Sequence, residues 1–360
     1  VLTSQLSKVG AQRAKFLVIQ NDLYRSMAMG RYDDLLKAAG KDPAMMMFLD
    51  TIESTAAAPN ENYSREMMEL FSMGEGNYTE DDVREAARAF TGWRLSAPER
   101  VEIPQGISEA ERRALLNQAF GDYEPEFLVR PRLHDSGEKT FLGRTGPWDG
   151  DDIADIVMEQ PATGRFITKR LFSEFAYRDP ADEVVEALVA VWEDSGHSVR
   201  EVVRAILASD EFNSEQAYRS IVRSPVQFVV GAVRGLEIET DFRGIDRIGG
   251  GMGQVLFEPP SVGGWPGGAS WLSSANFFGR VNFLDAFLFP QGRPTEIPVL
   301  SGLPNAEAMV DEALRRLVDD NVSDEARESL YAHASAISSA RERAATVAYL
   351  VLASPEFQLV

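Results

Sequence analysis

Apolar residues recur at helical spacing along most of the chain. A period of three to four residues marks one buried face of an α-helix, whereas a strand alternates every second residue. We therefore expect a mainly α, multi-helix globular fold. The first predicted segment, 5–29, is either one long helix or two short ones. Further helices are predicted at 32–39, from 43 onward, from 62 to the turn at 73–77, from 80 to the glycine at 92, and at 151–159, 161–178, 181–195, 198–209, 272–287, 305–319, 324–338 and 341–353.

Two stretches depart from this helical pattern. Prolines punctuate residues 96–150, where 126–130 and 139–143 have the pattern of short strands and 135–138 that of the turn between them. This predicts a small β-hairpin excursion on a helical body. Residues 244–268 are rich in glycine and proline and predict an irregular loop. We assign residues 1–360 to a single large helical domain.

One predicted helix carries polar groups beside its apolar face. Asn62, Glu66 and Glu69 follow one edge of that face. A carboxylate beside a core has to be paired, hydrogen-bonded or used in chemistry. Two interpretations stay open. The edge is either a polar brace, in which Glu61, Arg65 and Glu69 form a ladder at spacing four, or a ligand-binding or catalytic site.

The charge and the cysteine content narrow the classes of partner and site. Against 36 lysines and arginines stand 56 aspartates and glutamates, a formal charge of −20 in 360 residues. This surface repels phosphate backbones, so we expect no nucleic-acid partner. The absence of cysteine excludes disulfides and thiolate sites but does not fix the compartment. No apolar run reaches the length of about 18 residues that a membrane span needs.

The histidines offer a second candidate for chemistry. Of the three, His134 stands next to Asp135 and shortly before Lys139. A histidine beside an acid can act as a general base, with Lys139 stabilising charge. The alternative is a turn histidine whose ring bonds a backbone carbonyl. We expect His197 and His333 to be structural.

Tryptophans near glycines are candidates for the wall of a binding site. They either line a ligand cleft or plug the core under a loop; we name Trp93 and Trp265 as ligand-binding candidates, with Trp148 and Trp271 as similar anchors. The sequence contains neither a Gly-x-Ser-x-Gly elbow nor a His-Glu-x-x-His motif. It therefore leaves the metal, the cofactor and the reaction open.

Two helix ends repeat the same short pattern. Residues 203–212 and 347–357 are each an apolar helix that ends in Ala-Ser, followed shortly by Glu-Phe. We expect two similar helix ends, each closed by a phenylalanine that returns to the core.

Several motif blocks together resemble one known family, the bacterial domain-of-unknown-function family 1800. The resemblance covers nearly the whole chain, with the blocks in the same order. The blocks are Asn60-Glu61-Asn62-Tyr63 with Arg65-Glu66 and Glu69-Leu70-Phe71; residues 76–83 and Phe90-Thr91-Gly92-Trp93; His134-Asp135, Gly137, residues 139–143 and Asp149-Gly150; Phe257-Glu258-Pro259-Pro260, residues 264–268 and Trp271; and Ser354-Pro355-Glu356-Phe357-Gln358.

The resemblance implies a cellular location and a neighbouring gene product, but it does not imply a reaction. Members of that family are commonly exported, which implies an extracytoplasmic location, periplasmic or secreted. They are often encoded beside a second exported protein that resembles the alkaline phosphatase and sulfatase superfamily. They usually begin with a helical segment carrying a Trp-His-x-His-Phe-like motif, whereas this chain starts at Val1. We therefore expect a processed or partial chain, in which a metal site using those histidines would be incomplete.

These observations support two hypotheses about function. The first is an exported bacterial protein with a polar cleft built from Asn62, Glu66, His134 and Lys139, with Trp265 on its wall, suited to acid/base or metal-assisted chemistry. The second is a non-catalytic interaction or assembly module. It would bind a partner chain or the cleaved N-terminal segment of its own precursor. The sequence does not decide whether the protein is an enzyme, nor its substrate, cofactor or oligomeric state.

Overall fold

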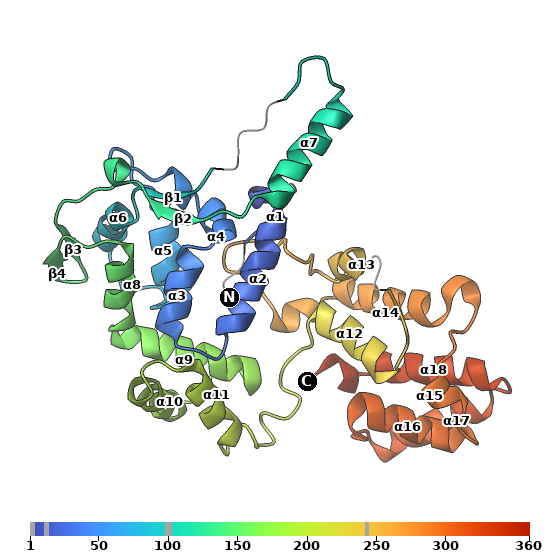
Figure 1. The fold of residues 1–360 in the computed structure, drawn as a ribbon. Coiled ribbons are helices and arrows are strands. Elements are labelled where there is room, and N and C mark those ends of the chain that lie inside the picture. Colours follow the sequence, from blue (N-terminus) through green and yellow to red (C-terminus); the bar gives the residue numbers. More distant parts are fainter. Residues whose placement is uncertain (1–3, 11–13, 98–102, 242–244) are drawn as a thin grey trace. The chain divides into compact units, whose positions relative to one another are not determined.

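The computed structural model describes residues 4–10, 14–97, 103–241 and 245–360. Within them the fold is mainly helical, with two small antiparallel sheets, as the sequence predicts (Figure 1). The chain divides into two compact units: unit 1 comprises residues 1–212 and 257–264, and unit 2 comprises 213–256 and 265–360. The assignment of one single domain stays a prediction. Parts of three predicted segments, at 11–13, 98–102 and 244, lie outside the described residues.

Unit 1 contains eleven of the described helices. Most lie where the apolar period predicts them, and the first predicted segment is two helices rather than one. Their bounds are α1 Leu6–Val9, α2 Lys15–Met27, α3 Tyr32–Gly40, α4 Pro43–Phe48, α5 Asn62–Glu69, α6 Glu80–Ala89, α7 Glu109–Asp122, α8 Gly150–Met158, α9 Pro161–Phe175, α10 Asp182–Asp194 and α11 Val199–Ala208.

Helix α7 corrects the expectation that residues 96–150 lack helices. It begins with a capping box, in which the Ser108 hydroxyl accepts a hydrogen bond from the Glu111 amide and the Glu111 carboxylate accepts one from the Ser108 amide. This Ser-x-x-Glu signal is visible in the sequence. The prolines around it led to the prediction of an irregular, non-helical stretch, which was wrong for these residues.

Two of the four described strands, β2 (Phe127–Val129) and β3 (Lys139–Phe141), lie where the sequence predicts strands, but the pairing differs and β1 (Trp93–Leu95) and β4 (Arg144–Gly146) were not predicted. Strand β2 pairs with β1, and β3 pairs with β4. The expected pairing of 126–130 with 139–143 was therefore wrong. The hairpin turn is instead Leu142-Gly143, where φ is 46° and 77°, because a two-residue type I′ turn needs positive φ at both central residues.

Unit 2 is a helical bundle around its own apolar core. The core joins α12, α16, α18 and the segment after α18 through Phe228, Leu314, Val351 and Phe357, all nearly fully buried. The helices are α12 Pro225–Gly235, α13 Ile245–Gly251, α14 Ser274–Leu288, α15 Pro298–Ser301, α16 Ala306–Val318, α17 Asp324–Ser335 and α18 Ala340–Ala353, followed by the short 3-10 helix η6 Glu356–Gln358.

The glycine- and proline-rich stretch 244–268 is less irregular than expected. It begins with α13, and its middle part, 257–264, belongs to unit 1. There the Leu6 amide donates to the Phe257 carbonyl at 2.8 Å, and the Ser7 hydroxyl donates to Glu258 at 2.7 Å. This segment therefore holds α1 in place.

Candidate functional site

Helix α5 positions the acidic edge that the sequence singled out. Tyr63, Met67 and Met68 are buried on its inner face. The Tyr63 ring meets Phe90 edge-on at 4.8 Å, and the Ser64 hydroxyl donates to the Val83 carbonyl at 3.1 Å. Because both partners belong to α6 or its C-cap, α5 is fixed along α6 and its outer edge has a defined direction.

Most polar groups on this edge have partners. Arg65 forms an ion pair with Glu80 at 2.7 Å and a longer one with Glu61 at 3.3 Å. Glu69 accepts a hydrogen bond from the Tyr78 hydroxyl at 2.9 Å. These contacts fit the interpretation of a polar brace: the Glu61–Arg65 pair of the ladder is present, whereas Tyr78 rather than Arg65 contacts Glu69.

Asn62 lies at the exposed start of α5. Its side-chain amide donates to Asp50 at 3.1 Å, and the Lys8 ammonium reaches the same carboxylate at 2.8 Å. Asn62 therefore links α5 to the turn before it and, through Asp50, to α1. No local sequence signal indicates this partner, because the contact depends on the tertiary fold.

Glu66 is different from its neighbours. Its side chain is half-buried, and no hydrogen bond or ion pair to it is found among the residues that the structure describes. Burial, together with the neighbouring Glu69 carboxylate, raises the pKa of Glu66 above its usual value, and Arg65 opposes this in part. A partly desolvated carboxyl group without a partner is suited to exchange a proton or to bind a ligand.

His134 lies in the turn after β2. Its Nδ1 is 2.9 Å from the Thr91 carbonyl oxygen, which makes Nδ1 the donor in the neutral ring and leaves Nε2 as an acceptor. Gly92 makes this approach possible: its φ is +78°, and a Cβ there would lie 2.8 Å from the Arg130 oxygen and 2.9 Å from the His134 nitrogen. The ring thus bonds a backbone carbonyl, as the structural alternative anticipated.

Lys139 is fully buried beside the same turn. Its ammonium donates to the carbonyl oxygens of Asp135 at 2.7 Å and Gly137 at 3.0 Å. Burial lowers its pKa, and the Asp135 carboxylate opposes that change. Lys139 therefore closes the turn from inside, with its charge directed at backbone oxygens.

Arg88 is a member of this turn that the sequence analysis missed. It forms ion pairs with Asp135 at 2.7 Å and with Glu85 at 2.8 Å. The Arg88 contact is the main cause of the lowered pKa of Asp135. The local signal was present, because Glu85 and Arg88 stand three residues apart on one helix.

The structure brings His134 and Lys139 together but places Glu66 away from them. Glu66 and Glu69 lie near Tyr78, before α6 begins, whereas His134 contacts Thr91, after α6 ends. The ten residues of α6 span about 15 Å at 1.5 Å per residue. The fold of unit 1 therefore does not place Glu66, His134 and Lys139 in a single cleft.

The tryptophan candidates fall in different surroundings. Trp93 is buried in an aromatic cluster, 5.0 Å from Phe90 and 4.9 Å from Phe127 between ring centroids. Trp93 therefore fills the core, which is the second of the two alternatives offered for the tryptophans. Trp265 is half-buried and belongs to unit 2, outside the unit that holds the other candidates.

The other two histidines also have defined places. His197 Nδ1 pairs with Asp33 at 2.8 Å, and its ring stacks on Trp192 with centroids 5.0 Å apart. His333 is exposed on α17 at the rim of a cavity in unit 2. Among the described residues, no group of three or more histidine, aspartate or glutamate side chains is placed to hold a metal ion.

A family model described as a protein of unknown function, DUF1800, matches residues 1–359. The chain belongs to the DUF1800 family. This confirms the resemblance drawn from the motif blocks. Comparison with curated proteins and with solved structures gave no match.

In this DUF1800 chain the motif blocks are divided between the two units. The blocks around α5, α6 and the His134 turn lie in unit 1, as does segment 257–264, whereas Trp265 and the final block 354–358 lie in unit 2. In the part of the chain that the structure covers, no helix combines the length and apolar character needed to cross a bilayer. Membership of the DUF1800 family does not indicate which reaction, if any, the protein catalyses.

Proposed function

We propose that the protein binds a small ligand at Glu66 on the outer edge of α5, and that this carboxyl group is the proton donor or acceptor of any reaction there. One observation supports this proposal most directly. Glu66 is half-buried and has no partner among the described residues, although the other polar groups on the edge are paired. A desolvated carboxylate is costly unless it is paired or used.

The chemistry follows from the two neighbouring carboxyl groups. Glu69 is oriented by the Tyr78 hydroxyl and acts as a fixed acceptor. The raised pKa of Glu66 brings its proton exchange closer to neutral pH, which favours general acid and base roles. Such a pair suits a ligand that carries a cation or several hydrogen-bond donors.

The experiment compares Glu66→Gln with Glu75→Gln. The first change keeps the shape but removes the titrating group, and the second removes a charge from an exposed turn nearby. Native mass spectrometry of the protein purified from its own source, followed by identification of small molecules and metals that remain bound, provides the readout. We expect the Glu66→Gln protein alone to lose the bound molecule. A folded Glu66→Gln protein that retains it in full would refute the proposal.

We also propose an extracytoplasmic location, for which the family resemblance is the support. Cell fractionation with a cytoplasmic and a periplasmic marker protein tests it. If the protein expressed from its full-length gene is recovered only in the fraction that contains the cytoplasmic marker, the proposal is contradicted.

A second candidate function is an interaction module, which a surface of unit 1 favours. Met29 and Leu207 are each 43% exposed, and together with Val203 they form an apolar patch flanked by Arg200 and Arg204. In a chain of charge −20, a patch with a cationic border suits an apolar segment with acidic flanks. The partner would be a separate chain or an N-terminal segment of the same precursor.

The patch is tested by placing a charge in it. Leu207→Asp should abolish co-purification of the partner chain, whereas Val18→Asp, at another exposed apolar position, should leave it unchanged. Equal recovery of the partner with both variants would exclude this surface.

A further inference from the structure

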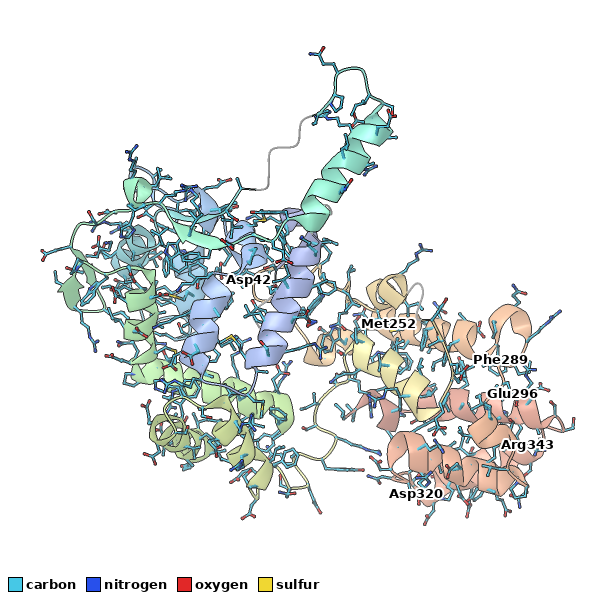
Figure 2. The ribbon with its side chains drawn as sticks, viewed as in Figure 1. Asp42, Met252, Phe289, Glu296, Asp320 and Arg343 are labelled. Carbon is cyan, nitrogen blue, oxygen red and sulfur yellow. The ribbon has the colours of Figure 1, made fainter. Side chains whose placement is uncertain are left out.

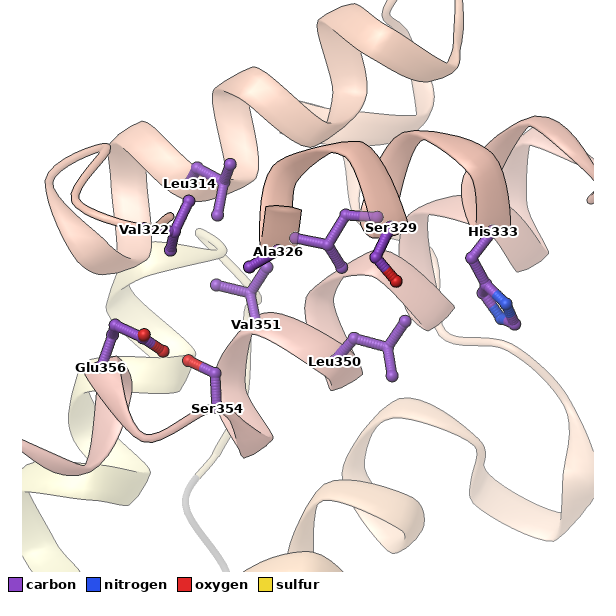
Figure 3. A pocket seen from close by; sticks show the side chains of 10 residues that line it. Leu314, Val322, Ala326, Ser329, His333, Leu350, Val351, Ser354 and Glu356 are labelled. Atoms are coloured by element: carbon purple, nitrogen blue, oxygen red, sulfur yellow. The ribbon is translucent and has the colours of Figure 1, made fainter. Parts of the chain in front are cut away.

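The last helices of unit 2 line an open cavity of about 350 Å³ (Figure 3). Its walls come from α16, α17, α18 and η6. Most of the wall is apolar, which suits the body of a small organic molecule. The apolar lining residues are Leu314, Val322, Ala326, Leu330, Leu350 and Val351.

One end of this cavity is polar. The Glu356 carboxylate and the Ser354 hydroxyl lie together there and point toward each other, while His333 lies at the opposite end (Figure 3). No hydrogen bond or ion pair of the Glu356 carboxylate is found within the described ranges. The Ser354 oxygen is shielded from solvent and likewise has no hydrogen-bond partner there. The cavity thus has an apolar body and an end that presents an unpaired negative charge.

The repeated helix end at Ser209 provides a comparison for Ser354, although aspartate follows Ser209 and proline follows Ser354. Ser209 follows α11 as Ser354 follows α18. The Ser209 hydroxyl donates to the Ile206 carbonyl at 2.8 Å and accepts from the Phe212 amide at 3.1 Å. A serine hydroxyl normally satisfies itself in this local way. At Ser354, where Pro355 stands in the place of Asp210, the hydroxyl makes no such hydrogen bond to the described residues and lies beside a carboxylate.

We propose that this cavity binds a small primary amine with an apolar body. The ammonium group would pair with Glu356 and hydrogen-bond to Ser354, whose hydroxyl can turn between staggered rotamers to meet it. At roughly 30 Å³ for each water-sized group, the volume accommodates about twelve non-hydrogen atoms. The site lies in unit 2 and is independent of the function proposed for Glu66.

Charge complementarity selects the amine over other apolar molecules. An anion would face the unpaired Glu356 carboxylate at close range, and a neutral molecule would leave that carboxylate without a counter-charge. Outside the polar end, the walls offer a small hydrated cation only the hydroxyl oxygen of Ser329, and this is too few oxygen ligands to hold it. A primary amine matches the cavity because its apolar part contacts the apolar walls and its ammonium group faces the Glu356 carboxylate.

The experiment uses three probes with similar bodies and different heads. 2-Phenylethylamine, 2-phenylethanol and 3-phenylpropanoate are titrated into the full chain by isothermal titration calorimetry, with amide NMR shifts to locate the site. We expect the amine to bind about tenfold more tightly than the alcohol, as one charge-assisted hydrogen bond predicts, and the carboxylate not to bind. The shifted amides should belong to α17 and α18.

Variants separate the specific pairing from attraction to an acidic protein. Glu356→Gln should reduce the affinity for the amine about tenfold. Glu328→Gln removes an exposed charge from α17 outside the cavity and should have no effect. Ala326→Phe fills the cavity and should abolish binding of the amine. Equal affinity for amine and alcohol, an equal loss in Glu356→Gln and Glu328→Gln, or no binding of the amine would each overturn the proposal.

Discussion

Replacing Asp42 with Asn tests the packing at the centre of unit 1. Asp42 is 2% exposed and caps α4, where its Oδ1 accepts from Gln20 at 2.7 Å and from the Met45 amide at 2.9 Å (Figure 2). Its Oδ2 is shielded and has no partner in the described ranges. Asn and Asp are equally good helix caps. The substitution therefore keeps the shape and the cap while it removes a buried charge.

Burial raises the pKa of Asp42 from 3.8 to about 6, although hydrogen bonds from Met45 and Gln20 oppose this. The rise of about 2.2, at 1.36 kcal/mol for each pKa unit, corresponds to about 3 kcal/mol. Because the folded-state pKa exceeds the unfolded-state value, the folded protein binds this proton more tightly. The stabilisation is complete below about pH 4 and is lost as the pH rises through about 6.

Urea unfolding followed by circular dichroism measures the free energy of unfolding from about pH 4 to pH 8. We expect Asp42→Asn to be more stable than the wild type by up to about 3 kcal/mol at pH 7.5, with the difference shrinking toward zero at pH 4. Asp149→Asn is the matched control, because Asp149 caps α8 from an exposed position. A stability difference for Asp42→Asn that stays constant across this range would refute the reasoning.

Three further substitutions test the turn of unit 1 and the core of unit 2. Lys139→Met should lower the free energy of unfolding by about 1–3 kcal/mol, because two carbonyls lose their buried donor; an unchanged urea midpoint would contradict this. Gly92→Ala should lower the melting temperature more than Gly76→Ala, because both have positive φ but only Gly92 is crowded; equal losses would show that crowding is unimportant. Phe357→Ala should cost about 3–5 kcal/mol, whereas Phe278→Ala, at a position 65% exposed, should cost under about 0.5, as guanidinium titration of both would show.

The helices of this fold were largely visible in the sequence, and the strand pairing was not. The capping box of Thr79 and Asp82 marks the start of α6 from four residues alone. Strand β1, by contrast, finds β2 more than thirty residues away. Short strands carry too little pattern to specify a distant partner, so the nearest strand was chosen and the pairing was wrong.

The candidate site shows the same limit. Helical spacing placed Glu66 and Glu69 on one edge correctly, because that depends only on local geometry. The separation of Glu66 from His134 depends on the direction in which α5 runs along α6, which the spacing does not encode. The burial of Lys139 was also hidden, because a lysine at the start of a short strand is normally exposed.

The return of segment 257–264 to unit 1 has a consequence for synthesis. The ribosome synthesises residues 1–212 before it synthesises segment 257–264, which binds Leu6 and Ser7. The intervening chain of roughly 45 residues takes about 2–9 s to make at 5–20 residues per second. During that interval the nascent amino-terminal helix lacks its tether. A gene truncated after the codon for Phe212 would leave this helix without the contact permanently, and such a fragment would be a ready substrate for proteases.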